Sequence, residues 1–376
     1  MSARIYLDYN ATAKVRPEAV AAATAALELG ANPSSTHAAG REARAVLERA
    51  RGEVASLVAA APGSVTFVSG GVEANALGME SALAAGIDRL IVGATEHDAV
   101  WACAHELSAN VEIWPVDARG VADLDWLSEA LGRGGRTLIC LMAANNETGV
   151  LQPVTETSRR VREAGGWLHV DAVQAAGKTP LSFDGLGADT LALSGHKIGG
   201  PQGVGALIAG ERTTITRRLH GGGQERGRRA GTENLSGIAG FGAAAVAALR
   251  DLPSLGDHSV WRARLAERMQ RAGATILGAG APRLAQTLCA ATPGFSSEVQ
   301  VMALDLAGVM VSAGAACSSG KVKASRVVEA MGRPDLASSS IRVSGGWASR
   351  EDDWVRFGEA WALILERHRA RKREYA

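Results

Sequence analysis

Short apolar runs alternate with longer amphipathic segments through the first two thirds of the chain. Residues 41–60 repeat apolar side chains at a helical period, which predicts an amphipathic helix. Apolar, β-branched runs predict strands, and helix-like stretches follow all of them except the last, "VGALIAG". The expected strands lie within 64–70, 89–95, 136–149, 166–177, 190–197 and 204–210.

These repeated strand–helix units predict a mostly parallel sheet with helices on both faces. Ligands of such sheets bind where the carboxyl ends of the strands meet. Polar clusters fall at those ends in this chain, in "SGGVEAN", "TEHDA", "NNETG", "VDAVQ" and "SGHK". We therefore expect a functional site at that edge of the sheet.

A second unit follows "RDLPSLG". It contains three helix-like segments, at 260–273, 297–308 and 350–372, and two strand-like runs, at 287–294 and 341–346. This pattern predicts a smaller α+β domain. We expect a large domain over 15–252 and a small domain built from 1–14 and 253–376, with a mobile cysteine loop at about 312–325.

The composition narrows the possible partners. The 376 residues suit two domains, and 47% apolar with 21% charged residues is ordinary for a globular protein. Forty Lys and Arg against 39 Asp and Glu give a net charge of +1, which argues against nucleic acid or an anionic membrane as the main partner. The first ten residues form no apolar signal segment and no apolar run is long enough to span a membrane, so a cytoplasmic location is the default expectation.

The four cysteines are separated by 37, 149 and 28 positions, without a CxxC pair. This spacing disfavours a metal site held by this chain alone, and a cytosolic location disfavours disulfides. Cys103 and Cys140 lie in apolar runs and are expected to be inert packing residues. Cys317 lies instead in "SAGAACSSGKVKAS", a pliable setting for a thiol, which leaves packing or a nucleophile as its role.

Two strand ends carry candidate chemistry. Lys197 in "SGHKIGGPQG" could be an ordinary surface lysine, but an amine at a strand tip before a glycine-rich turn is also what an imine-forming lysine needs. Asp171 in "HVDAVQ" could be a helix N-cap, or a carboxylate against the pyridinium nitrogen of pyridoxal phosphate. In the second case Gln174 could hydrogen-bond the ring hydroxyl.

Three more strand ends fit the same cofactor. "FVSGGVEAN" places a glycine pair before a helix, the arrangement of a phosphate-binding nest. His97 could stack on a planar ring or cap a turn, and Asn145 and Asn146 could be turn formers. Each motif alone has an ordinary explanation. Their joint order predicts a fold-type-I pyridoxal-phosphate enzyme of the α/β class.

The chain resembles the NifS/IscS-type cysteine desulfurases of the class V aminotransferase group. The resemblance covers nearly the whole chain, and its most specific parts are "SGHK", "HGGGQERGRRAGT" and "GAACSSG". The other matching motifs are "YLDYNAT", "NPSSTH", "SGGVEAN", "TEHDAV", "NNETGV", "HVDAVQ" and "SSIRVS".

The resemblance implies a role for each matching residue. Lys197 forms the imine with pyridoxal phosphate, Asp171 pairs with the ring nitrogen, and Gln174 contacts the ring hydroxyl. His97 stacks on the ring and acts as an acid–base group, and Cys317 is the nucleophile. The phosphate ligands are Ser194, His196, Gly71 and Val72 together with Thr232 from a partner subunit, and the substrate carboxylate is bound by Asn146, which also lies at the cofactor, and by Arg342.

The implied activity is removal of sulfur from L-cysteine to give L-alanine and a persulfide on Cys317. The persulfide sulfur then passes to an acceptor protein for iron–sulfur cluster or other sulfur-cofactor assembly, and the enzyme is a homodimer without a metal. A selenocysteine lyase or another C–S lyase is the alternative. The chain departs from the family pattern at Val72, where Thr is frequent, at Ala13 and Lys14 after "NAT", and at Lys321 and Lys323.

Overall fold

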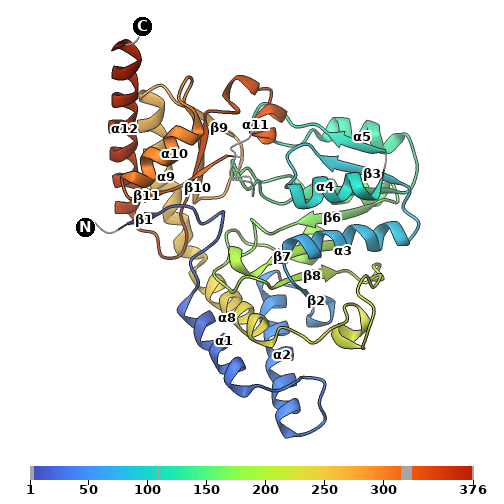
Figure 1. Cartoon of the computed structure of the whole chain (residues 1–376). Helices are drawn as coiled ribbons and strands as arrows, with labels where there is room; N and C mark the ends of the chain where they lie inside the picture. Colours follow the sequence, from blue (N-terminus) through green and yellow to red (C-terminus); the bar gives the residue numbers. More distant parts are fainter. Residues whose placement is uncertain (1–3, 109, 315–323, 375–376) are drawn as a thin grey trace.

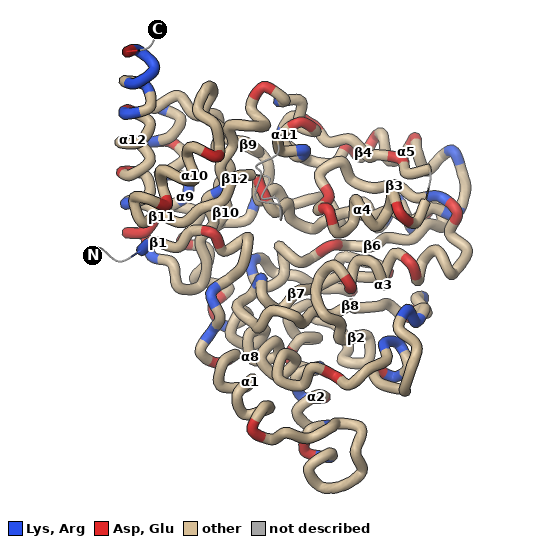
Figure 2. Tube along the Cα trace, viewed as in Figure 1, with Lys and Arg blue, Asp and Glu red and all other residues tan. Residues whose placement is uncertain are grey.

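The computed structural model describes residues 4–108, 110–314 and 324–374 (Figure 1). Cys317, Lys321 and Lys323 lie outside the described residues. A large sheet flanked by helices occupies one side of the molecule, and a smaller unit with both ends of the chain lies beside it. Lys and Arg are interspersed with Asp and Glu over most of the trace, in keeping with a net charge of +1 (Figure 2).

The large sheet has seven strands in the order β2-β8-β7-β6-β5-β3-β4. Neighbouring strands are parallel except at β8, which is antiparallel to both β2 and β7. The mixed α/β fold with a mostly parallel sheet is thus confirmed. The strands are β2 (Val65–Val68), β3 (Arg89–Gly93), β4 (Val111–Trp114), β5 (Thr137–Met142), β6 (Trp167–Asp171), β7 (Thr190–Ser194) and β8 (Gly205–Ala209).

Helices cover both faces of this sheet because its side chains alternate between two apolar layers. Ile139 and Leu141 of β5 pack into the same cluster as α2, α5, α6 and α8, whereas Leu138 and Cys140 pack with α3 and α4. Buried strands of this kind read as continuous apolar runs. The helices of the large unit are α1 (Pro17–Leu29), α2 (Ala38–Leu57), α3 (Gly71–Ala84), α4 (Asp98–Leu107), α5 (Leu124–Gly132), α6 (Val154–Glu163), α7 (Phe183–Leu186) and α8 (Leu235–Asp251).

The smaller unit contains a four-stranded antiparallel sheet in the order β12-β13-β10-β9. A short parallel pair joins β1, near the start of the chain, to β11. The domain boundaries expected from the sequence stay a prediction. The elements are β1 (Ile5–Tyr6), β9 (Thr275–Leu277), β10 (Thr287–Ala291), β11 (Val309–Met310), β12 (Ser312–Ala313), β13 (Ser340–Ser344), α9 (His258–Arg271), α10 (Ser297–Leu306), α11 (Arg326–Ala330) and α12 (Glu351–Glu374).

The expected helix after "TLALSGHK" is wrong. A single 3-10 turn, Gly195–Lys197, follows β7, and the chain then reverses into β8. Gly199 and Gly203, with φ of 89° and 74°, adopt the left-handed conformation that allows this reversal. The remaining 3-10 helices are Pro62–Ser64, Gln224–Gly227, Pro253–Asp257 and Pro334–Leu336.

Two further expectations need adjustment. After Asp171 the chain forms turns instead of an α-helix. The range 312–325 is not all loop, since Ser312–Ala313 pairs with β13 and Ser325 caps α11 by accepting a hydrogen bond from the Val328 amide.

Among the described helices, none is by itself long and apolar enough to cross a membrane, although the bent pair Leu235–Asp251 and Pro253–Arg271, at 56°, meets that test by length and composition when taken together.

Candidate active site

A cavity of about 240 Å³ opens at the carboxyl ends of β5, β6 and β7. It brings together residues that lie far apart in the sequence, as the parallel strand order predicts. Nine of the residues singled out in the sequence line it: Gly71, Val72, His97, Asn146, Asp171, Gln174, Ser194, His196 and Lys197.

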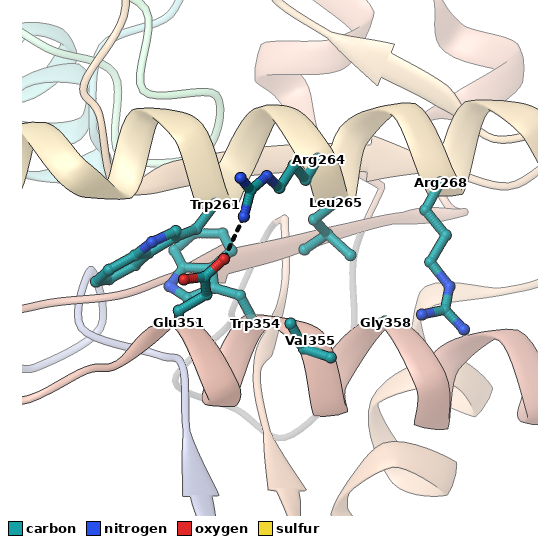
Figure 3. Close-up of a pocket in the computed structure, with 8 residues that line it drawn as sticks. All are labelled: Trp261, Arg264, Leu265, Arg268, Glu351, Trp354, Val355 and Gly358. Carbon is teal, nitrogen blue, oxygen red and sulfur yellow. Dashed lines mark hydrogen bonds and ion pairs between the residues drawn. The ribbon is translucent and has the colours of Figure 1, made fainter.

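A second hollow lies elsewhere and is not part of this site. It is a groove of about 100 Å³ between α9 and α12, with Trp261 and Leu265 on one side and Trp354 and Val355 on the other (Figure 3). This groove contains none of the residues singled out in the sequence. The cavity at the strand ends is therefore the candidate active site.

Lys197 ends the 3-10 turn after β7 and points its amine toward the N-terminal segment. Its Nζ donates to the carbonyl oxygens of Asn10 (2.7 Å) and Ala11 (2.8 Å). Burial, together with the positive charge of Arg342, lowers the pKa of Lys197 to about 8, against the opposing effect of two carboxylates. Lys197 is therefore not an ordinary solvated lysine, and about a tenth of its amine is uncharged at pH 7, far more than for a solvated lysine.

Asp171 is the last residue of β6 and its carboxylate is buried at the cavity wall. Its Oδ1 accepts a hydrogen bond from the Val173 amide (2.9 Å), and its Oδ2 accepts one from Asn75 Nδ2 (2.8 Å). The first bond is that of an ordinary capped turn. The second comes from α3, which packs on the sheet face that carries His169 and Asp171, and it fixes the position of the carboxylate.

One end of the cavity, where α3 begins, suits a phosphate. α3 begins there at Gly71, and the free amides of a helix N-terminus attract anions. A Cβ at position 71 would lie 2.9 Å from Val173 Cγ2, so any larger residue would require Val173 to move. Ser194 lines this end, and its hydroxyl makes no hydrogen bond to another described residue. His196 Nδ1 is 3.0 Å from Thr12 Oγ1, and burial lowers the pKa of His196 to about 4.

His97 both caps a helix and lines the cavity, so its two sequence-based interpretations are compatible. Its Nδ1 accepts a hydrogen bond from the Ala99 amide (3.1 Å) at the start of α4. This bond leaves Nε2 as the N–H of a neutral ring. Asn145, by contrast, uses its side-chain oxygen to accept hydrogen bonds from Glu147 and Thr148, as a turn former does.

Arg342 lies on β13 beside the cavity but does not line it. Its Nη2 donates to Asp8 Oδ1 (2.8 Å) and its Nη1 donates to the Asn146 carbonyl (3.2 Å). Its Nε is buried without a hydrogen-bond partner among the described residues.

Sequence reasoning missed Asn10, which connects several parts of the site. Its carbonyl accepts hydrogen bonds from Lys197 Nζ and Gln174 Nε2 (2.8 Å). Its side-chain Nδ2 donates to the Asn146 carbonyl and to Thr287 Oγ1, both at 3.1 Å. The motif "YLDYNAT" was a signal, but its partners come from four other segments that no local pattern joins.

Lys178 was also missed. Its buried Nζ donates to Gln174 Oε1 (2.5 Å) and Asn10 Oδ1 (3.1 Å), which orients both side chains. Burial, together with the nearby charge of Lys197, lowers the pKa of Lys178 well below its usual range. Glu96 is also buried. Burial and the negative charge of the neighbouring Asp171 raise the pKa of Glu96 to about 8.

Thr232 is the predicted residue that the structure places apart from this cavity. Thr232 is exposed and lines a separate cavity of about 230 Å³ with Arg229 and Glu233. Cys317 lies outside the described residues. No three His, Cys, Asp or Glu side chains in the described part of the chain are placed to hold a metal ion.

The sequence was compared with known proteins. The protein-family model for class-V aminotransferases matches residues 5–357. The chain belongs to the class-V aminotransferase family. A cysteine desulfurase of Cereibacter sphaeroides is 42% identical to this family member over 91% of this chain and 90% of its own. A cysteine desulfurase IscS of Dictyoglomus turgidum is 37% identical, covering 94% and 92%.

A solved structure agrees. The NifS-like protein of Rickettsia africae superposes with a TM-score of 0.89 at 30% identity, over 96% of this chain and 99% of that one. The fold-type-I architecture and the resemblance drawn from the sequence are therefore confirmed. The activity of this class-V aminotransferase family member is that of a cysteine desulfurase that depends on pyridoxal phosphate.

The cavity residues fit this cofactor. A lysine amine, a buried carboxylate and a phosphate-sized polar end lie around one space, as a phosphorylated pyridine aldehyde requires. Pyridoxal phosphate, when bound, supplies an electron sink for the substrate Cα.

Proposed function

We propose that the enzyme takes sulfur from L-cysteine onto the Cys317 thiol and releases L-alanine. The observation that supports this most is the joint placement of Lys197 and Asp171 in one cavity, beside the Arg342 Nε, which has no partner among the described residues. This arrangement provides an amine, a ring-nitrogen partner and a carboxylate-binding group for a small amino acid.

In this proposal the cavity residues divide into cofactor and substrate groups. Asp171 holds the proton on the ring nitrogen, and Gln174 donates from Nε2 to the ring oxygen. Lys197 binds the cofactor and then takes the Cα proton of the substrate, for which its lowered pKa suits it. The remaining roles are phosphate binding by Ser194, His196, Gly71 and Val72, ring stacking and acid–base chemistry by His97, and substrate-carboxylate binding by Asn146 and Arg342.

The thiols of the described residues support Cys317 as the nucleophile by contrast. Burial raises the pKa values of Cys103, Cys140 and Cys289, so each stays a thiol at neutral pH. In the proposed step the Cys317 thiolate attacks the substrate sulfur and an S–S bond forms. The C–S bond breaks with its electron pair left on the three-carbon fragment, which is protonated and leaves as alanine.

Two variants test this proposal. Cys317→Ala should keep the yellow colour of the bound cofactor but form neither alanine nor persulfide from cysteine, whereas Cys103→Ala, a matched control, should retain both. Lys197→Ala should lose the colour of the covalently bound cofactor. Peptide mass spectrometry after cysteine treatment should place the extra sulfur on Cys317. Turnover that survives Cys317→Ala would refute the proposal and favour a selenocysteine lyase or other C–S lyase.

The proposal extends to the assembly and the destination of the sulfur. Thr232 lies away from its own chain's cofactor cavity, which supports a homodimer in which it reaches the partner's phosphate. The persulfide sulfur then passes to an acceptor protein for iron–sulfur cluster or other sulfur-cofactor assembly. Transfer of labelled sulfur from the enzyme to a candidate scaffold protein tests this step. The cytoplasmic location expected from the sequence stays a prediction.

A further inference from the structure

A chain of hydrogen bonds leads from Asp171 into the interior of the large unit. Asn75 Nδ2 on α3 donates to Asp171 Oδ2 (2.8 Å), and Asn75 Oδ1 lies 2.9 Å from His169 Nε2 on β6. His169 Nδ1 lies 2.8 Å from Thr190 Oγ1 on β7. The exposed fractions are 1% for Asn75, 0% for His169 and 2% for Thr190, so water does not compete for these bonds.

The chemistry of the groups determines the direction of every bond in this chain. A carboxylate only accepts hydrogen bonds, so the Asn75 amide must turn its NH2 toward Asp171 and its oxygen toward His169. His169 Nε2 must then carry the proton. A neutral ring has only one N–H, so Nδ1 accepts from the Thr190 hydroxyl. Burial lowers the pKa of His169 to about 4, which keeps the ring neutral.

Close packing between α3 and the sheet fixes the position of the His169 ring. A Cβ at Gly78 of α3 would lie 2.7 Å from His169 Nδ1 and 3.2 Å from Thr190 Oγ1. Glycine at this position therefore lets α3 approach β6 closely enough for Asn75 to bridge His169 and Asp171. A buried polar group without a partner costs free energy. The side chains of Asp171, Asn75, His169 and Thr190 therefore fix one another's orientation.

We propose that His169 and Thr190 are positioning residues that hold the Asn75 amide with its NH2 toward Asp171. Through Asn75 they keep the Asp171 carboxylate oriented to retain the proton on the cofactor's ring nitrogen. The inference rests on the role of Asp171 in the proposed function. If Thr190 no longer donates, His169 Nδ1 has no partner and the ring can turn, so its bond to Asn75 Oδ1 weakens and the Asn75 amide holds the Asp171 carboxylate less firmly.

The test uses the holoenzyme reconstituted with pyridoxal phosphate labelled with ¹⁵N in the ring, because the ¹⁵N chemical shift reports protonation of that nitrogen. Thr190→Val and His169→Phe keep the shape of the side chains and remove the hydrogen bonds. Both should move the ring signal from the protonated toward the unprotonated position, and Thr190→Ser should restore it. Thr157→Val is the matched control, since Thr157 is equally buried and its hydroxyl has no partner among the described residues.

Asp171→Ala separates this inference from the proposed function. If Asp171→Ala leaves the ring signal unchanged, the proposed role of Asp171 is wrong. If Asp171→Ala moves the signal but Thr190→Val and His169→Phe do not, the positioning role is wrong and the chain serves stability alone. Should His169→Phe fail to fold, Thr190→Val decides by itself, with the tautomer of His169 read from its own ring ¹⁵N shifts.

Discussion

Arg342 and Asp8 form an ion pair of 2.8 Å between β13 and the segment after β1. The Asp8 carboxylate also accepts a hydrogen bond from Ser312 Oγ (2.7 Å) at the start of β12. These bonds hold the Arg342 guanidinium beside the cavity while its Nε stays without a partner among the described residues. In the proposed function this donor serves the substrate carboxylate.

Replacing Arg342 by Lys tests this donor. Lysine keeps the charge but lacks the planar fork, so hydrogen bonds worth about 1.5–3 kcal/mol to a charged group are lost. We expect KM for cysteine to rise about 10- to 100-fold, with the absorbance of the bound cofactor unchanged. Steady-state kinetics measure this, and Arg262→Lys on α9 is the control. An unchanged KM would show that the carboxylate binds elsewhere.

Lys178→Met should weaken cofactor binding. Methionine has a similar length but cannot donate to Gln174 Oε1, so the Gln174 amide loses the bond that orients it. The loss of one hydrogen bond, about 1 kcal/mol, predicts a dissociation constant for pyridoxal phosphate that is about 3- to 10-fold higher. Titration of the apo-protein measures it. Lys372→Met, on the exposed end of α12, should have no effect, and equal values for the two variants would contradict the orienting role.

His258 makes the small unit sensitive to acid. It is buried against Trp261 and Trp354, at ring-centroid distances of 4.5 and 5.9 Å, and burial lowers its pKa to about 4. The unfolded chain takes up a proton near pH 6.5 but the folded chain does not. Stability is therefore full above pH 6.5 and is lost as the pH falls toward 4, by up to about 3 kcal/mol for this residue.

His258→Phe should remove this share of the acid sensitivity. The ring still packs between the two tryptophans, and no proton uptake distinguishes the folded from the unfolded chain at this position. Urea denaturation of the apo-protein at pH 7 and pH 5 measures the change. The difference between the two pH values should be smaller in the variant, though not zero, because His169 and His196 are also buried. An identical difference would show that His258 does not contribute.

Mixing two defective subunits tests whether Thr232 serves the partner. Lys197→Ala has no cofactor lysine, and Thr232→Ala lacks the proposed phosphate contact. In a mixed dimer, one of the two sites would combine the intact Lys197 of one chain with the intact Thr232 of the other. We expect tight cofactor binding to return in that site after co-expression, measured by dialysis and absorbance. If no mixed sample recovers tight cofactor binding, Thr232 contacts the phosphate of its own chain's cofactor or contacts no phosphate at all.

Much of the site was predictable because it depends on a simple geometric rule. Asp171 and Ser194 end β6 and β7, and Asn146 follows β5; these three strands are parallel, so polar residues at their carboxyl ends meet at one edge of the sheet. The buried runs also identified these strands without any tertiary information. The wrong prediction of a helix after Lys197 has an equally local cause. The glycines of "GGPQG" allow the chain to reverse direction there, and the helix prediction did not take this into account.

The residues that were missed share a different property. Asn10 and Lys178 are separated by 168 positions, and Asn75 and Asp171 by 96. Each has an ordinary local context, and each acquires its role from a partner in another segment. The lowered pKa values of Lys178 and Lys197 have the same origin, since burial depends on what the rest of the chain places around the amine.

The sequence by itself determined six of the seven strands of the large sheet, the polar edge of that sheet, the cofactor class and the family, because these follow from periodicity and from motifs confined to short segments; the edge strand β4 was not expected. Only the tertiary structure decided which donors face which acceptors. It showed that Asp8 pairs with Arg342 and that Asn10 connects Gln174 and Lys197. It also showed that the buried His169 is linked to Asp171 through Asn75. Hydrogen bonds require partners within about 3 Å, and such proximity arises only when distant segments pack together.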